Sequence, residues 1–219
     1  MRTSREEASM SKHLSRLVLL AALLPLYAAA QERAAPEQPA HRHLGFFIRP
    51  ELGFGGFASA ASQDGVDYSI SGGGGAFALA IGGAVSEDFI VGGQVWDVIA
   101  SKPDWTIKSG GTEVKGTSSS DAGLVGYGVL LNWYLQPSNV YLAVTPSLTR
   151  LVSTQGTTTT TSDWGFGIRG AVGKEWWVAD HWGIGVAASI GLSSNKDGGS
   201  GAPTWGSAAF AVTCSATYN

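Results

Sequence analysis

The chain has 219 residues, of which 14% are charged and 31 are glycine. Soluble domains usually carry about 25% charged residues and about 7% glycine, so this composition disfavours an ordinary water-soluble enzyme. The formal net charge of −3 provides no basic surface for neutralising phosphates, and we expect no nucleic-acid partner.

The N-terminus has the pattern of a secretory signal peptide. A short apolar core at residues 17–27 follows basic residues and leads into Ala28-Ala29-Ala30, the small-residue pattern that a signal peptidase needs. This core is too short to cross a bilayer, which takes about 20 apolar residues. We therefore predict a cleaved signal peptide over residues 1–30, with either Met1 or Met10 as the true start.

The mature chain divides into a lead-in and a long alternating region. Residues 31–43 mix proline, alanine and charges without periodicity, which is typical of a flexible periplasmic lead-in. Over residues 44–219, apolar and small residues alternate with a period of two, which predicts β-strands. The alternating segments cover residues 44–57, 68–86, 89–99, 123–135, 140–152, 164–178, 182–192 and 205–218.

The face opposite the apolar side chains decides which kind of β-protein this is. That face is mostly Gly, Ala, Ser and Thr, and most charged residues lie between the segments. Small side chains suit the crowded lumen of an eight-stranded barrel, whose apolar face is then left for lipid. We predict an all-β fold, an eight-stranded antiparallel up-and-down transmembrane β-barrel.

The connections between the segments alternate in length. The short ones lie at residues 87–88, 136–139 and 180–181. The long ones lie at residues 58–67, 101–120, 153–163 and 193–204. This alternation is typical of outer-membrane barrels, which have short periplasmic turns and longer external loops.

Aromatic residues near the ends of the segments predict two membrane-interface belts. The belt near the short turns contains Phe89, Trp133, Tyr134, Tyr141, Trp176, Trp177 and Trp182. The belt near the long loops contains Phe57, Tyr68, Trp96, Trp164 and Trp205. The alternation is less regular around Trp96 and Asp97, where we expect a bulge. A tryptophan cluster as a sugar or ligand platform is the alternative interpretation.

Together, the leader, the alternating connections and segments such as GFFIRPELGFGG and HWGIGVAASIGL resemble the small outer-membrane β-barrel superfamily that includes OmpA-like and OmpX-like proteins. The resemblance implies a place in the bacterial outer membrane and contact with membrane lipid and lipopolysaccharide. It also implies the barrel-assembly machinery as a partner, which in that superfamily reads an aromatic residue ending the last strand. Here Tyr218 is the penultimate residue.

Four charged residues share the inward-facing parity of the strands: Arg49, Glu51, Arg169 and Glu175. Each charge in a narrow lumen needs a partner, so we interpret them as a structural ion-pair network that plugs the barrel. The alternative is a gated proton or ion path. Steady, porin-like conductance is not expected, because eight strands leave no aqueous bore.

The sequence offers little for catalysis. The mature chain has only His41, His43 and His181, and no serine lies beside His181 on its strand face, as a nucleophile and its base would require. Cys214 is the single cysteine, and the histidines are not spaced as metal ligands. We predict that the protein is not an enzyme and has no metal or cofactor.

The long loops, rich in Gly, Ser, Thr and Asp, are then the best place for function. Near that rim, Arg150 has the outward parity and is placed to meet lipid phosphates. The favoured hypothesis is a structural or surface-interaction role through these loops. The alternatives are a small transporter or channel, and an exported soluble barrel that binds an apolar ligand inside.

Overall fold

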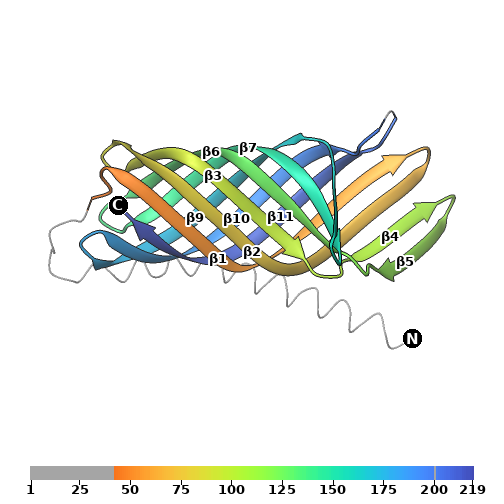
Figure 1. The fold of residues 1–219 in the computed structure, drawn as a ribbon, viewed down its shortest axis with the longest axis horizontal. Coiled ribbons are helices and arrows are strands. Elements are labelled where there is room, and N and C mark those ends of the chain that lie inside the picture. The colour runs from red at the N-terminus through yellow and green to blue at the C-terminus, as the bar shows by residue number, and fades with distance from the viewer. Residues whose placement is uncertain (1–41, 200) are drawn as a thin grey trace. The chain divides into compact units, whose positions relative to one another are not determined.

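The computed structural model describes residues 42–199 and 201–219, so the predicted signal peptide and the predicted lead-in up to residue 41 lie outside the described residues. The described part is built from strands (Figure 1). They are β1 (Phe46–Gln63), β2 (Val66–Ser86), β3 (Phe89–Ala100), β4 (Asp104–Ser109), β5 (Thr112–Thr117), β6 (Asp121–Leu135), β7 (Val140–Gln155), β8 (Thr158–Thr161), β9 (Gly165–Ala179), β10 (Trp182–Lys196) and β11 (Thr204–Tyr218). Residues 42–199 and 201–219 contain no helix long and apolar enough to cross a bilayer.

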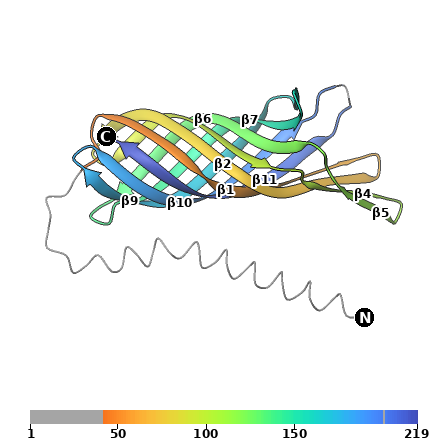
Figure 2. The same ribbon diagram turned by 60° about the horizontal axis from the view of Figure 1, so that its bottom comes forward.

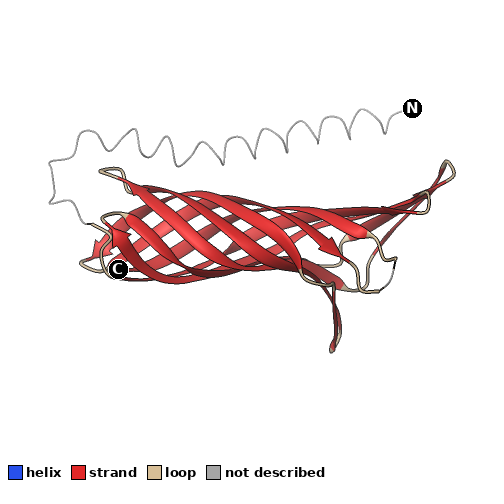
Figure 3. Cartoon of the chain, turned by 90° about the horizontal axis from the view of Figure 1, so that it is seen from above, coloured by secondary structure: helices blue, strands red, loops and turns tan. Residues whose placement is uncertain are grey.

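Eight long strands close into an antiparallel barrel. The order around the wall is β1, β2, β3, β6, β7, β9, β10 and β11, and β1 pairs with both β2 and β11. Figure 3 shows these strands winding obliquely around one closed wall. The predicted fold is therefore confirmed: each segment found by alternation is one wall strand, and sequential neighbours pair throughout.

The period of two sorts side chains between the outside and the lumen. On β1, Leu52 and Phe54 are 67% and 80% exposed, whereas Phe47 and Arg49 are fully buried. The other wall strands repeat this arrangement, with Phe166 on β9 and Ile190 on β10 also largely exposed. Large apolar side chains thus cover the outer surface, and the charged residues of the wall interior are shielded from solvent.

The three short turns lie where the sequence predicts them, between β2 and β3, β6 and β7, and β9 and β10. Asp88 and Asn139 hold positive φ angles of 61° and 53° in two of these turns. Asp and Asn tolerate this left-handed conformation better than other residues with a Cβ atom. Both described chain ends lie beside the turns, since Ala84 donates to Gly45 and Asn219 donates to His181 through their backbone amides.

The long connections contain more strand than predicted. We expected a loop over residues 58–67, but β1 and β2 continue as a paired hairpin to Asp64 and Gly65. Both turn residues have positive φ, as a two-residue hairpin turn requires. The connection after β3 folds into the β4–β5 hairpin, and β4 extends the sheet by pairing with β2. In Figures 1 and 2, β4 and β5 lie beside the end of this long hairpin, away from the C-terminus.

Two apolar layers fill much of the lumen. One lies toward the short turns and contains Phe47, Ala80, Ile90, Leu130, Tyr134, Tyr141, Ala143 and Ala187. The other lies toward the long connections and contains Phe57, Ala76, Ala78, Trp96, Val98, Ala100, Leu124, Ala209 and Ala211. The lumen therefore holds several large rings in addition to the small side chains that the sequence predicts.

Glycines on the wall make room for these rings. A Cβ atom on Gly126 would lie 2.3 Å from the Trp96 ring, and one on Gly173 would lie 2.4 Å from the Tyr141 ring. Each ring lies across the neighbouring strand at a place where only a hydrogen fits. The bulge predicted near Trp96 and Asp97 is wrong, because β3 keeps one register with β2 and β6 through both residues.

Adding a methyl group under the Trp96 ring should therefore destabilise the barrel. We expect Gly126→Ala to lower the free energy of unfolding by about 1–3 kcal/mol, because an overpacked core forces rings out of their preferred positions. Urea titration in detergent micelles measures it. Gly170→Ala is the matched control, since a Cβ atom there meets nothing within 4 Å, and equal stability of the two variants would contradict the packing account.

Candidate functional site

A polar layer crosses the lumen between the two apolar layers. It brings together all four inward-facing charged residues that the sequence singled out. Glu51 is the centre of one half: its Oε1 lies 3.2 Å from Nε of Arg49, and its Oε2 lies 2.8 Å from Nη2 of Arg169. Thr213 also donates to Oε2 of Glu51, at 3.2 Å. This carboxylate therefore bridges two guanidinium groups, one from its own strand β1 and one from β9.

Glu175 is the centre of the other half. Its Oε1 lies 3.5 Å from Nη1 of Arg49 and accepts hydrogen bonds from Tyr134 and Thr217, at 3.0 and 2.7 Å. The guanidinium of Arg49 also lies over the Tyr141 ring, 4.2 Å from its centroid. Arg49 is thus held by two carboxylates and by the faces of the Tyr141 and Phe47 rings.

All four charged side chains are at most 5% exposed, and the layer pairs two cations with two anions. A buried charge is tolerated only when it is paired and hydrogen-bonded. Gln94 adds to the network, because its Oε1 accepts from Arg169 and from Thr145. These ion pairs and hydrogen bonds connect β1, β9 and their neighbouring strands across the lumen.

The short-turn end is closed by residues for which the sequence predicts a flexible lead-in. His43 is fully buried and stacks on Tyr134 with ring centroids 3.4 Å apart. Its Nε2 lies 2.7 Å from Oδ1 of Asn139, and Nη1 of Arg42 lies 2.8 Å from Oδ2 of Asp88. For Arg42 and His43 the lead-in prediction is wrong, because the turns supply polar partners that the sequence does not reveal.

Asp88 is the polar centre of this closure. Burial alone would raise the pKa of its carboxyl group. Hydrogen bonds from Gln136, the His43 amide and Arg42 favour the charged form and outweigh burial, so the pKa lies below its usual range. The stabilisation that Asp88 gives is accordingly present at neutral pH and is lost as the pH falls through this lowered value.

The belt residues divide into two groups. Trp133, Trp164, Trp176 and Trp182 lie on the outer surface, and each is between 38% and 56% exposed. Trp96 is 2% exposed and donates through Nε1 to Ser147 inside the lumen. Trp205 shares the inward parity of β11 and lines a cavity. The belt assignment is wrong for these two, because proximity to a strand end does not determine which face a side chain occupies. Of the wider set, Phe57, Tyr134 and Tyr141 also lie inside.

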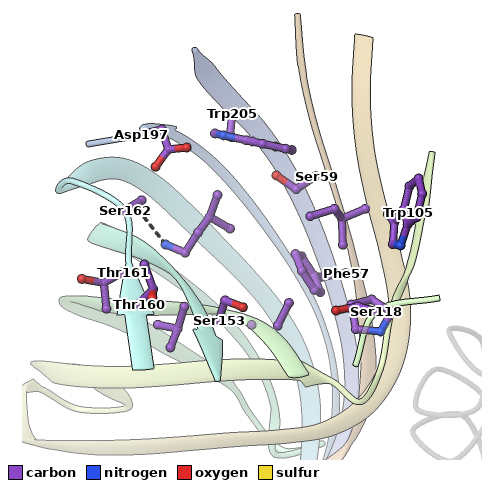
Figure 4. A pocket seen from close by; sticks show the side chains of 16 residues that line it. Phe57, Ser59, Trp105, Ser118, Ser153, Thr160, Thr161, Ser162, Asp197 and Trp205 are labelled. Carbon is purple, nitrogen blue, oxygen red and sulfur yellow. Dashed lines mark hydrogen bonds between the residues drawn. The ribbon is translucent and has the colours of Figure 1, made fainter. Parts of the chain in front are cut away.

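A cavity of about 350 Å³ lies at the end of the long connections (Figure 4). Phe57, from the apolar layer that lies toward the long connections, forms the floor of the cavity. Ile70 and Leu151 pack against that layer and also line the cavity. Around them, the cavity is lined by Ser59, Pro103, Trp105, Ser118, Ala122, Gly123, Val152, Ser153, Thr160, Thr161, Ser162, Asp197 and Trp205. Apart from the inward parity of Trp205, no local sequence pattern predicts this cavity.

The described part of the chain contains no metal-binding cluster. Across residues 42–199 and 201–219, no cluster of three or more His, Cys, Asp or Glu side chains is placed to hold a metal ion. His181 lies at the short-turn end, where its Nδ1 is 2.9 Å from the carbonyl oxygen of Asn219. Cys214 is exposed on the outer face.

These features define a small, closed eight-stranded antiparallel barrel with an apolar outer surface, and the solved structure of a surface protein shares this fold. No protein-family model matches the chain, and no curated protein matches its sequence. The structure is similar to that of Neisserial surface protein A, with a TM-score of 0.53 and 14% identity over 80% of this chain and 96% of that one.

Two weaker similarities involve other bacterial outer-membrane proteins. The outer membrane protein OprG from Pseudomonas aeruginosa gives a TM-score of 0.48 at 10% identity, covering 81% of this chain and 98% of that one. The outer membrane protease OmpT from Escherichia coli gives 0.45 at 8% identity, covering 84% and 99%. At 14% identity, the likeness to Neisserial surface protein A concerns the fold alone.

Neutralising the bridging carboxylate should weaken the barrel more than any change to an exposed ion pair. We expect Glu51→Gln to lower the free energy of unfolding by about 3–5 kcal/mol, because it leaves two buried guanidinium groups short of one anion. Urea titration in micelles measures the loss. Glu113→Gln is the control, since Glu113 pairs with Lys108 and Lys115 on the exposed β4–β5 hairpin. A loss no larger than that of the control would argue against an essential lumen network.

Proposed function

We propose that the chain is a non-enzymatic outer-membrane β-barrel with a structural or surface-interaction role, exported by its predicted signal peptide. One observation carries the proposal: the molecule is apolar outside and charged inside. Phe54 and Phe166 are 80% and 77% exposed, whereas Arg49 and Glu51 are buried. Exposed apolar area of this extent is unfavourable in water and favourable in a bilayer.

The orientation in the membrane follows from the connections. In barrels of this type, short turns and both chain ends face the periplasm, and the longer connections face outward. The β1–β2 hairpin, the β4–β5 hairpin and the cavity would then lie on the external side. The surface role is assigned to this end because it holds the exposed polar side chains of the long connections.

Refolding tests the membrane assignment. The mature chain, beginning at Gln31, should fold in detergent micelles and migrate differently on a gel before and after boiling, because a folded barrel resists unfolding by detergent. Expressed with its leader, the protein should fractionate with outer membranes and begin at Gln31 by N-terminal sequencing. A stable monomer in detergent-free buffer would instead support the soluble ligand-binding barrel.

The alternative function is that of a small transporter or channel, and the polar layer is the observation that favours it. Several buried polar atoms in that layer, including Nη2 of Arg49 and Oε2 of Glu175, have no hydrogen-bond partner in the described part of the chain. Large rings border the layer on both sides, however, so we expect no steady conductance in planar bilayers. Stepwise currents from the purified barrel would replace the structural role with a conducting one.

Lipopolysaccharide phosphate is the partner that the outer rim fits best. Arg150 has the outward parity of β7, and its guanidinium lies over the Trp164 ring, 4.4 Å from the centroid. A guanidinium stacked on an interfacial tryptophan is held at the depth where lipid phosphates lie.

Arg150→Gln should therefore weaken binding of lipopolysaccharide to the refolded barrel, measured by titration in mixed micelles. Arg150→Lys, which keeps the charge, should retain most of the binding. Affinity unchanged by Arg150→Gln would remove this contact from the proposal.

A further inference from the structure

The cavity at the end of the long connections is an open bowl with a closed floor. Phe57 and Leu151 lie at its base, and Trp96 belongs to the same apolar layer beneath them. Trp96 is 2% exposed and lies over Gly126 and Gly191, so this ring fills the lumen below the bowl. The cavity is therefore a place where a molecule can be held, and it does not continue into a passage through the barrel.

Three parts of the chain that are distant in sequence form its walls. Trp105 comes from β4, Thr160 and Thr161 come from β8, and Trp205 comes from β11. Strand pairing holds each of these parts against the barrel, since β4 pairs with β2 and β8 pairs with β7. The volume of about 350 Å³ falls in the range of small-molecule sites, and walls fixed in advance reduce the entropic cost of binding.

The lining selects a chemical class. Most of the surface that the lining exposes to the cavity is apolar, which favours a ligand with an apolar body. Among the described residues, Asp197 is the only charged one that lines the cavity, and Figure 4 shows it at the edge across from Ser59 and near Trp205. A carboxylate attracts a cation, and indole rings add cation–π attraction to the same charge. Both observations disfavour an anion.

We infer that this cavity binds a small amphipathic amine, with its apolar body in the bowl and its ammonium group at Asp197. The hydroxyl group of Thr160, which also lines the cavity, can accept a further hydrogen bond from the ammonium group. The inference is separate from the proposed membrane role, because the lining is the same wherever the barrel resides.

Three matched probes test the charge preference. Isothermal titration of the micelle-refolded chain would compare 1-naphthylmethylamine, the neutral 1-naphthylmethanol and the anionic 1-naphthylacetate. We expect the amine to bind most tightly and the anion least. Asp197→Asn should lower the amine affinity about threefold to fivefold, as for an exposed ion pair, and leave the alcohol unchanged. Asp64→Asn, at the tip of the β1–β2 hairpin, is the matched control and should change neither.

A variant with a filled cavity distinguishes binding of the probes in the cavity from their uptake by the detergent micelles. Ser153→Trp places a ring inside the cavity and should abolish the binding of all probes, while micelle uptake stays the same. Trp205→Ala provides a second route and should weaken the amine about tenfold, as removal of an aromatic anchor does. The difference in gel mobility before and after boiling confirms that each variant is folded, and Trp205→Ala replaces Ser153→Trp if the latter does not fold.

The outcomes are distinct. Equal heats for the wild-type chain and the filled variant would overturn the site, whether or not the barrel inserts into membranes. An amine that binds no tighter than the alcohol, or an amine affinity that survives Asp197→Asn, would overturn the assigned ligand class. Tight binding of the amine that is lost in the filled variant supports the inference even if the protein does not fractionate with outer membranes.

Discussion

The narrow lumen is the constraint on which the rest of this structure depends. Eight strands enclose a space that side chains must fill, so large and small residues have to alternate around the wall. Trp96 is accommodated because Gly126 and Gly191 lie against it, and Tyr141 because Gly173 does. The same lack of space leaves bulk water no room to solvate a charge. Arg49 and Arg169 are consequently stabilised by carboxylates within the lumen.

The two ends of the barrel satisfy this constraint differently. At the short-turn end, the chain entering β1 closes the lumen with His43, which stacks on Tyr134 and forms a hydrogen bond with the turn residue Asn139. At the other end the filling stops at Phe57, and the space above it remains open between strands that continue past the barrel wall. The difference between the two ends of the barrel thus comes from packing as well as from the length of the connections. One end is sealed, and the other is concave.

Much of this architecture follows from the sequence because it depends on a local pattern. Alternation with a period of two gives the wall strands and their faces, and inward parity gives Arg49, Glu51, Arg169 and Glu175. The belt prediction places Trp96 and Trp205 on the wrong surface because it rests on nearness to a strand end. The regular alternation of β11 gives the inward face of Trp205, whereas the alternation around Trp96 is too irregular to give its face. The Asp64-Gly65 pair is a hairpin signal that the sequence carries openly. Closure by His43 and the walls of the cavity depend on contacts between distant segments, which no local pattern encodes.

The β1–β2 hairpin also has a geometric consequence. β1 pairs with β11 only as far as Ala60, and beyond that residue it pairs with β2 alone. At about 3.3 Å per residue, the remaining residues of β1 raise the Asp64-Gly65 turn roughly 10 Å above the last pairing with β11. Side chains on a strand alternate between its two faces, so adding one residue to each strand would exchange the faces of the side chains at the tip of this hairpin. Adding or removing two residues on each strand keeps every face the same. We therefore expect natural variation in the length of this hairpin to come in steps of about two residues per strand.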